Sequence, residues 1–143
     1  MEFMKKFKPE KNAVKEFDYW IVLFREKQVT LGATVIVLKR EIQSFSQMTS
    51  EEAAEFPKVV EWFEKLSAEL FGAEKFNYVA AMMKDNFVHY HAFPRYSTVF
   101  SKYGVEWKDV TWPKVIEFLE VKYEDDLLEA IKKDLRLFGD AIW

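Results

Sequence analysis

Four short apolar segments, rich in β-branched and aromatic residues, are typical of β-strands. Residues 17–24 (FDYWIVLF) and 34–38 (TVIVL) form the first two, and a glycine lies in the connection between them. Residues 76–83 (FNYVAAMM) and 87–93 (FVHYHAF) form the other two, and only residues 84–86 separate them. The lysine, aspartate and asparagine in that gap tolerate the backbone of a tight turn. The pattern therefore predicts a strand pair followed by a hairpin.

Two further segments have the features of amphipathic helices. Thr49 and Glu52 form a capping box that begins the first helix, and Gly72 supplies its stop. Its buried face is predicted to consist of residues at three- and four-residue spacing: Phe56, Val59, Val60, Phe63, Leu66 and Leu70. The second helix is predicted over residues 124–138, because acids start it, bases end it and Gly139 follows.

These elements predict an α+β fold, in which an antiparallel sheet of about five strands has the first helix across one face and the final helix at its edge. The stretch after Pro94 is rich in aromatic residues, and we expect it to pack over the sheet. Residues 113–123 remain unassigned. No repeat, low-complexity tract or linker divides the chain, so the prediction is a single domain over residues 1–143.

Composition and charge narrow the functional classes. Half of the 143 residues are apolar and 17% are aromatic, which suits a self-sufficient core. The absence of cysteine excludes thiol nucleophiles, disulfides and cysteine-ligated zinc. A net charge of −3 argues against a nucleic-acid polymer as partner, and the lysines between residues 5 and 15 are interpreted as a solvated, partly mobile terminus. No apolar run is long enough for a signal peptide or a membrane span, so we expect a soluble, cytoplasmic protein with no membrane partner.

The only two histidines of the chain, His89 and His91, lie two positions apart in the last predicted strand. Alternate residues of a strand share a face, so both imidazoles are predicted to point the same way, together with Phe87 and Phe93. Imidazole can act as a nucleophile or a proton carrier near neutral pH. The pair alone leaves three roles open: catalysis, a metal site completed by a carboxylate, or hydrogen bonding within the core. We expect no metal and no cofactor.

The run FVHYHAFPR, residues 87–95, resembles the signature of the histidine triad (HIT) family. In that family three alternating histidines lie in a strand that ends two residues later in a Pro-Arg pair. Upstream, residues 22–52 follow the family's usual order of a strand, a turn with a glycine, a second strand, a basic residue and a capped helix. The resemblance implies a HIT-like core over about residues 19–96. Residues 97–143 carry no recognised motif and are interpreted as a C-terminal extension.

The resemblance assigns roles to the strand residues. His89 falls on the central histidine, which in the family attacks the α-phosphate of a nucleotide and becomes transiently nucleotidylated. His91 falls on the third, a supporting member. Phe87 replaces the first histidine, and it has no hydrogen-bonding group to take that histidine's part in the network. The nucleophile itself is retained.

Four other side chains are candidates for nucleotide or phosphate binding. Arg25 falls where many family members have an asparagine that contacts the ribose, and a guanidinium there can pair with phosphate. Lys84 and Asn86 lie in the three-residue turn, where members commonly have a longer, glycine-containing loop near the nucleotide. Arg95 follows the Pro-Arg pattern, and for it a structural role and a ligand contact are both open.

The resemblance implies a nucleotide hydrolase or transferase that acts at the α-phosphate of a phosphoanhydride or a phosphoramidate, with diadenosine polyphosphates among the substrate classes. A homodimer, with a small-molecule nucleotide as its ligand, is also implied. Two alternatives stand beside this hypothesis. One is a HIT-like module that binds nucleotides with little or no turnover, because Phe87 and the short turn depart from the family pattern. The other is a structural or assembly role.

Overall fold

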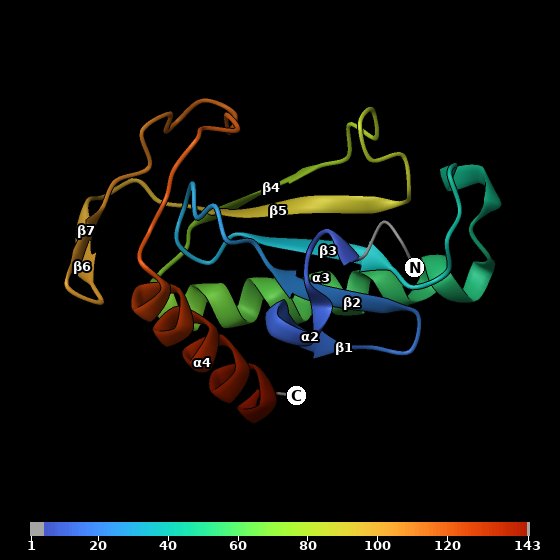
Figure 1. Ribbon diagram of the computed structural model, residues 1–143, viewed down its shortest axis with the longest axis horizontal. Helices are drawn as coiled ribbons and strands as arrows, with labels where there is room; N and C mark the ends of the chain where they lie inside the picture. The colour runs from blue at the N-terminus through green and yellow to red at the C-terminus, as the bar shows by residue number, and fades with distance from the viewer. Residues whose placement is uncertain (1–4, 143) are drawn as a thin grey trace.

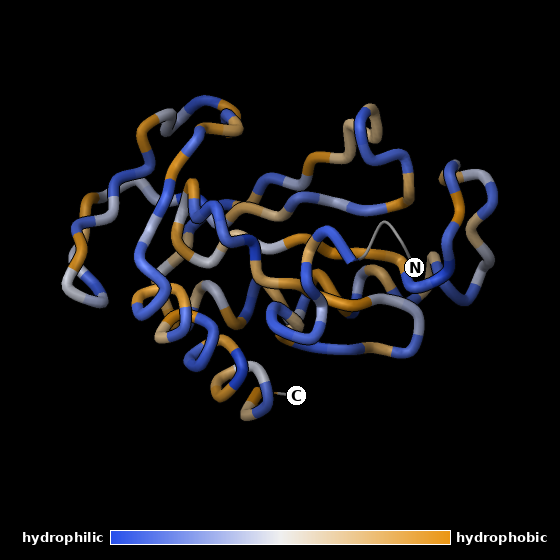
Figure 2. Tube along the Cα trace, viewed as in Figure 1, coloured by the Kyte–Doolittle hydropathy of each residue, from blue (hydrophilic) through white to orange (hydrophobic). Residues whose placement is uncertain are grey.

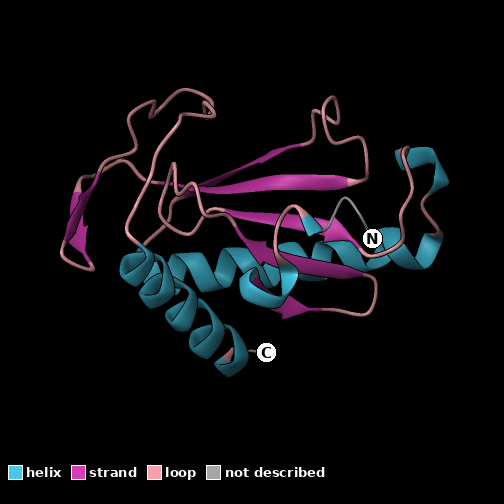
Figure 3. Cartoon of the chain, in the orientation of Figure 1, coloured by secondary structure: helices cyan, strands magenta, loops and turns pink. Residues whose placement is uncertain are grey.

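The computed structural model describes residues 5–142, so the first four residues and the last residue of the predicted domain lie outside it. A five-stranded antiparallel sheet has the strand order β1-β2-β3-β5-β4. The long helix α3 runs across one face of this sheet, and helix α4 packs beside α3 and β1 (Figures 1 and 3). The predicted α+β class, with a long helix across the sheet and a C-terminal helix, is therefore confirmed.

The described elements follow one another in chain order: α2 (Pro9–Asn12), β1 (Ala13–Glu16), β2 (Trp20–Phe24), β3 (Thr34–Leu38), the 3₁₀ turn η1 (Phe45–Gln47), α3 (Ser50–Phe71), β4 (Lys75–Val79), β5 (His89–Arg95), β6 (Phe100–Lys102), β7 (Val105–Trp107) and α4 (Asp125–Ala141). Strands β6 and β7 form a separate two-stranded hairpin. In the part of the chain that the structure describes, no helix is long and apolar enough to cross a membrane.

Helix α3 begins and ends as its residues predict. The Thr49 hydroxyl accepts a hydrogen bond from the Glu52 amide at 3.1 Å, and the Glu52 carboxylate accepts one from the Thr49 amide at 2.8 Å. These two bonds satisfy amides that have no partner within the first turn. Gly72 ends the helix with a φ of 77°, in the left-handed region that glycine adopts most easily. Among the predicted inward-facing residues, Val59, Phe63 and Leu66 are fully buried.

The sheet has two different faces. One face packs on α3: the Tyr90 ring of β5 lies 4.6 Å from the Phe56 ring of the helix and 6.2 Å from the Trp20 ring of β2. Side chains alternate along a strand, so the histidines of β5 point to the opposite face. Apolar colour recurs along β2 and β3 in the middle of the sheet (Figure 2). The face opposite α3 is therefore where the two imidazoles are displayed.

One strand of the five-stranded sheet was not predicted, and the bounds of β2, β4 and β5 differ from the prediction. Strand β1, only four residues with two of them charged, has no alternating apolar pattern long enough to be recognised, and it forms because β2 offers it an edge to pair with. Strand β4 ends at Val79 and β5 begins at His89. The predicted three-residue turn is wrong, because the connection runs over residues 80–88. The apolar residues at both ends of that connection resemble strand residues, so the sequence pattern does not show where the strand pairing stops.

The C-terminal third also departs from the prediction. Helix α4 does not stop at Gly139 but continues to Ala141. Gly139 has no positive φ; its α-carbon instead lies against the buried Trp62 ring of α3, where any side chain would collide. The aromatic stretch after Pro94 was expected over the sheet, but its β6–β7 hairpin lies beyond one end of the sheet (Figure 1). Residues 108–124 have no regular secondary structure.

Candidate functional site

His89 is held in one tautomer by the backbone. It opens β5 and pairs with Val37 of β3, and its Nδ1 lies 2.6 Å from the carbonyl oxygen of Phe87. A carbonyl oxygen can only accept, so Nδ1 carries the proton and donates it. In the neutral ring the lone pair is then on Nε2, the nitrogen that could attack an electrophile. The residue is only 3% exposed, and the Phe7 ring lies 6.4 Å from the imidazole.

His91 lies beside His89 and is surrounded mainly by aromatic rings. The two rings are 5.1 Å apart and nearly perpendicular, and the Phe118 ring lies 4.9 Å from His91 on edge. Its buried Nδ1 has no hydrogen-bond partner among residues 5–142. Burial lowers the pKa of His91 to about 4, and the positive charge of Arg25 adds to this effect. The imidazole is therefore neutral at pH 7.

Arg25 brings a cation to the same face of the sheet. It follows β2 directly, and its guanidinium lies over the rings of Phe93 and Phe118, at 5.4 Å and 5.3 Å from their centres. One guanidinium nitrogen donates to the Lys27 carbonyl at 2.6 Å. Burial lowers the pKa of Arg25 and the nearby Glu120 carboxylate opposes that change, so the side chain stays charged at neutral pH. The charge of Arg25 acts on His91, so the structure brings these two candidate site residues together.

A cavity of about 280 Å³ opens beside these two residues. His91 lies in its wall, with two phenylalanines and an asparagine. The charged residues of the wall are four cations and two carboxylates: Lys6, Lys8, Arg25, Lys27, Glu26 and Asp85. The excess of positive charge favours an anionic ligand. Cavities of this size accept part of a small molecule, because a typical ligand pocket measures about 300–1,000 Å³.

Of the four predicted binding residues, only Arg25 is among the described residues that line this cavity, and Lys84, Asn86 and Arg95 are not. Lys84 and Asn86 are exposed and are not among the described residues that line it. Asp85, between them, does line it and forms an ion pair with Lys6 at 2.5 Å. Phe87 is half-buried against an apolar cluster of β2 and β3 on the sheet face opposite α3. The β4–β5 connection turns Asp85 toward the cavity and leaves its two neighbours, Lys84 and Asn86, exposed.

Sequence reasoning missed the contribution of the N-terminal segment. The lysines between residues 5 and 15 were interpreted as a solvated terminus, yet Lys6 and Lys8 lie in the cavity wall, with Phe7 between them. The lysine cluster is the sequence signal that could have suggested a part for this segment in an anion site. Among the described residues, no group of three or more histidine, aspartate and glutamate side chains is placed to hold a metal ion.

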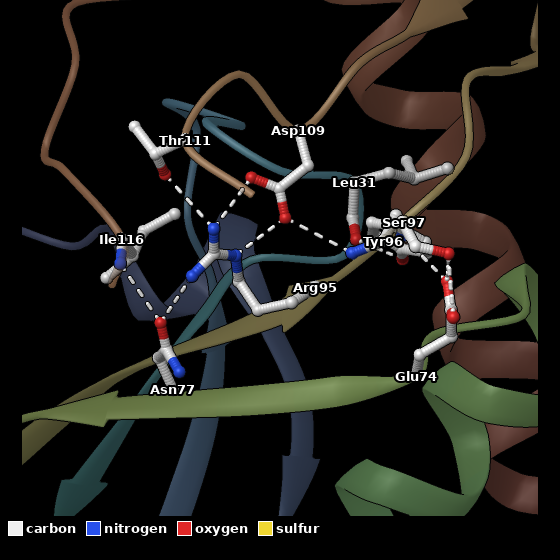
Figure 4. A network of polar contacts seen from close by, with 9 residues as sticks. All are labelled: Leu31, Glu74, Asn77, Arg95, Tyr96, Ser97, Asp109, Thr111 and Ile116. Atoms are coloured by element: carbon white, nitrogen blue, oxygen red, sulfur yellow. Dashed lines mark hydrogen bonds and ion pairs between the residues drawn. The ribbon is translucent and has the colours of Figure 1, made fainter. Parts of the chain in front are cut away.

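The Arg95 side chain is buried and bonded within the protein (Figure 4). Its guanidinium makes two bonds to the Asp109 carboxylate, at 2.6 Å and 2.9 Å, and both side chains are at most 3% exposed. It also donates to Asn77 at 2.6 Å and to Thr111 at 3.0 Å. Asn77 in turn accepts the Ile116 amide. This network ties the irregular segment 108–124 to the sheet and occupies the guanidinium, so Arg95 has a structural role here.

The chain was compared with known proteins. No family model and no curated protein matches it. Solved structures do. A histidine triad protein from Marinobacter aquaeolei superposes with a TM-score of 0.75 at 17% identity, over 97% of this chain and 96% of that one. A hypothetical histidine triad nucleotide-binding protein from Sulfolobus tokodaii gives a TM-score of 0.71 at 17% identity, over 99% and 93% of the two chains.

A third solved structure bears a more specific description. It is the diadenosine triphosphate hydrolase of Plasmodium falciparum in complex with cyclomarin A, with a TM-score of 0.61 at 13% identity, over 93% of this chain and 77% of that one. At such identities the likeness is one of fold. This chain therefore has the HIT-like α+β fold that the resemblance of its sequence implied.

Proposed function

We propose that this protein binds nucleotides in the manner of the histidine triad family, and that it cleaves a phosphoanhydride or phosphoramidate at the α-phosphate with His89 as nucleophile. The observation that carries the proposal is the bond between His89 Nδ1 and the Phe87 carbonyl. It leaves the lone pair on Nε2, in a strand that also places His91 beside a cationic cavity. The shared fold supports this reading of the site.

The first step is an in-line displacement at phosphorus. Nε2 of neutral His89 forms a bond to the α-phosphorus while the bond from that phosphorus to the leaving group breaks. The ring becomes cationic, and the Phe87 carbonyl stabilises this charge by accepting the hydrogen bond from Nδ1. In a second step a water molecule attacks the same phosphorus, the P–N bond breaks, and His89 returns to its neutral form with release of a nucleoside monophosphate and a proton.

Positive charge beside the reacting phosphate supports both steps. Arg25 and the lysines of the cavity wall can offset the charge that develops on the phosphoryl oxygens. His91, with a pKa of about 4, does not hold a proton at neutral pH. The proton for a basic leaving group therefore comes from water, and His91 acts as a neutral neighbour of His89.

His89 is nearly fully buried, so substrate can reach it only when the side chains that cover it, Phe7 among them, move aside. The Phe7 ring lies 6.4 Å from the His89 ring, and the neighbouring Lys6 forms an ion pair with Asp85. The lysine is half exposed, and ion pairs at such positions contribute only about 0–1 kcal/mol. The Lys6–Asp85 ion pair therefore adds little resistance when the Phe7 side chain moves away from His89.

A binding module with little or no turnover is the second candidate, and a specific observation favours it. Nδ1 of His91 is buried without a partner among the described residues, and Phe87 offers no side-chain group that could complete a network around the pair. Within either function we also propose a homodimer, a single domain over residues 1–143 with a HIT-like core at about 19–96, a cytoplasmic location, and a nucleotide and not a nucleic-acid polymer as ligand.

A single set of measurements separates the candidates. Purified protein is screened by thermal shift against adenosine and guanosine mono-, di- and dinucleotides, and product release is followed by chromatography. A shift with turnover that His89→Asn abolishes, while binding is kept, supports the hydrolase. Lys84→Ala is the control, because that side chain lies off the cavity, and it should keep turnover within about twofold. A shift without turnover supports the binding module, and no shift leaves only a structural role.

A further inference from the structure

Helix α4 contains a buried lysine that the proposed reaction does not use. Lys132 is 1% exposed, and burying an ammonium group is costly unless it is well paired. Its Nζ forms an ion pair with Glu129 at 2.7 Å and donates to two oxygens of the N-terminal segment, the Lys11 carbonyl and Asn12 Oδ1, each at 3.3 Å. It also lies 5.7 Å from the centre of the Phe24 ring. The ammonium therefore joins the C-terminal helix to the start of the chain.

Asn12 connects Lys132 to residues that line the cavity. Its side chain is buried, and because Lys132 can only donate, the amide oxygen must face the ammonium. The amide nitrogen then faces two acceptors, the Phe7 carbonyl at 2.8 Å and the Glu26 carboxylate at 2.9 Å. This hydrogen bond is the main reason that the pKa of Glu26 lies below its usual value. Every polar atom of the Asn12 side chain is thus used.

The residues joined in this way are walls of the cavity. Phe7, Asn12, Phe24 and Glu26 all line it, whereas Lys132 is not among its described lining residues and contacts Asn12 and Phe24 from behind. The segment between Phe7 and Asn12 includes Lys8, whose φ of 51° lies in a region that non-glycine residues rarely adopt. Such a backbone persists when surrounding contacts hold it in place.

We propose that Lys132 is a positioning residue for the substrate site, which fixes residues 7–12 as a wall of the cavity through its bonds to Asn12 and the Lys11 carbonyl. This inference rests on the proposed function, since it assumes that the cavity receives the nucleotide. It gives the C-terminal helix a part in ligand binding although no residue of that helix lines the cavity. Asn12 then anchors the segment at both ends, through its own bonds to Lys132 and through its bond to the Phe7 carbonyl.

The test compares Lys132→Met with Lys133→Met. Methionine keeps the bulk of the side chain and removes the donor, and Lys133 is an exposed lysine on the same helix, so its substitution changes the net charge equally. Two quantities are measured: hydrogen exchange of the amides in residues 7–12, and the Kd of ADP by calorimetry. We expect faster exchange in this segment and a Kd raised about tenfold or more for Lys132→Met, with kcat on any cleaved nucleotide unchanged within about twofold, and no change for Lys133→Met.

Unchanged exchange in Lys132→Met would overturn the inference, and so would a Kd that stays the same or falls, because a lower Kd would mean that the segment excludes the nucleotide. If the wild-type protein binds no ADP, the proposed function is wrong, and so is the role of Lys132 in substrate binding. The exchange data then still decide whether Lys132 holds residues 7–12 in place. Should Lys132→Met not fold, Asn12→Ser cuts the same connection and leaves Lys132 paired with Glu129. The same rise in exchange and Kd is expected from it.

Discussion

Replacing Gly139 by alanine tests the packing of the two helices directly. In an ordinary helix interior this change stabilises by about 1 kcal/mol, because alanine has the higher helix propensity. Here a Cβ at Gly139 would lie 2.6 Å from Cζ2 and 3.3 Å from Cε2 of Trp62. The indole is fully buried, and its Nε1 donates to the Gly139 carbonyl at 2.9 Å. Neither partner can withdraw without losing packing or that bond.

The expected balance is a net loss. Forcing an extra methyl group into a packed core costs about 1–3 kcal/mol, and weakening the indole hydrogen bond costs about 1 kcal/mol more. Subtracting the gain in helix propensity leaves Gly139→Ala less stable by about 1–3 kcal/mol. Urea unfolding at pH 7 measures the difference as a lower midpoint with an unchanged slope. Asp140→Ala, at the exposed neighbouring position, is the control and should stay within about 0.5 kcal/mol of wild type.

A second substitution isolates the cause. In a Trp62→Phe background the smaller ring leaves space for the new methyl group, so Gly139→Ala should there cost much less than in the wild type. A wild-type background in which Gly139→Ala raises the midpoint would refute the argument. It would mean that Gly139 is an ordinary helix glycine, and that the contact with Trp62 does not decide which residue can stand there.

Two further predictions concern charges. The pKa of His91 is about 4 in the folded protein, below the 6.5 of an unperturbed histidine, so the unfolded state takes up the proton first as pH falls. The contribution of this group to the free energy of unfolding is therefore complete above about pH 6.5 and is lost toward pH 4, by about 2 kcal/mol after allowance for its partial exposure. Urea unfolding at pH 7 and at pH 4.5 should show a smaller loss of stability in His91→Phe than in the wild type. An equal loss in the two proteins would contradict the prediction. Asp109→Ala leaves the buried Arg95 guanidinium without its carboxylate and should cost about 3–5 kcal/mol in the same assay, whereas Glu106→Ala, an exposed neighbour, should be nearly neutral.

Local patterns along the chain predicted the parts of the fold that local physics controls. The capping box of Thr49 and Glu52 and the glycine stop at Gly72 mark the ends of α3, because both act within one turn of the helix. The apolar runs of β2 and β3 are buried on both faces, so they are easily recognised. The prediction at Gly139 was wrong, because the sequence does not distinguish a glycine that lets two helices pack closely from a glycine that ends a helix.

The candidate site was predicted in part, for a similar reason. The spacing of His89 and His91 is a property of a single strand, so their common face follows from the sequence. That His89 donates to the Phe87 carbonyl, and that Arg25 lies near His91, depends on how the chain turns between strands. The catalytic role of His89 and the ligand roles of the cavity residues stay predictions until the nucleotide and variant measurements are made.

The sequence by itself determined the α+β class, the long capped helix and the strand that carries both histidines, because each depends on residues only a few positions apart. Only the tertiary structure decided which side chains surround those histidines. Lys6 and Lys8 of the N-terminal segment line the cavity, Arg95 is paired with Asp109, and Lys132 meets Asn12 across a separation of 120 residues. Contacts of this kind arise when distant segments are packed together, and no local spacing along the chain records them.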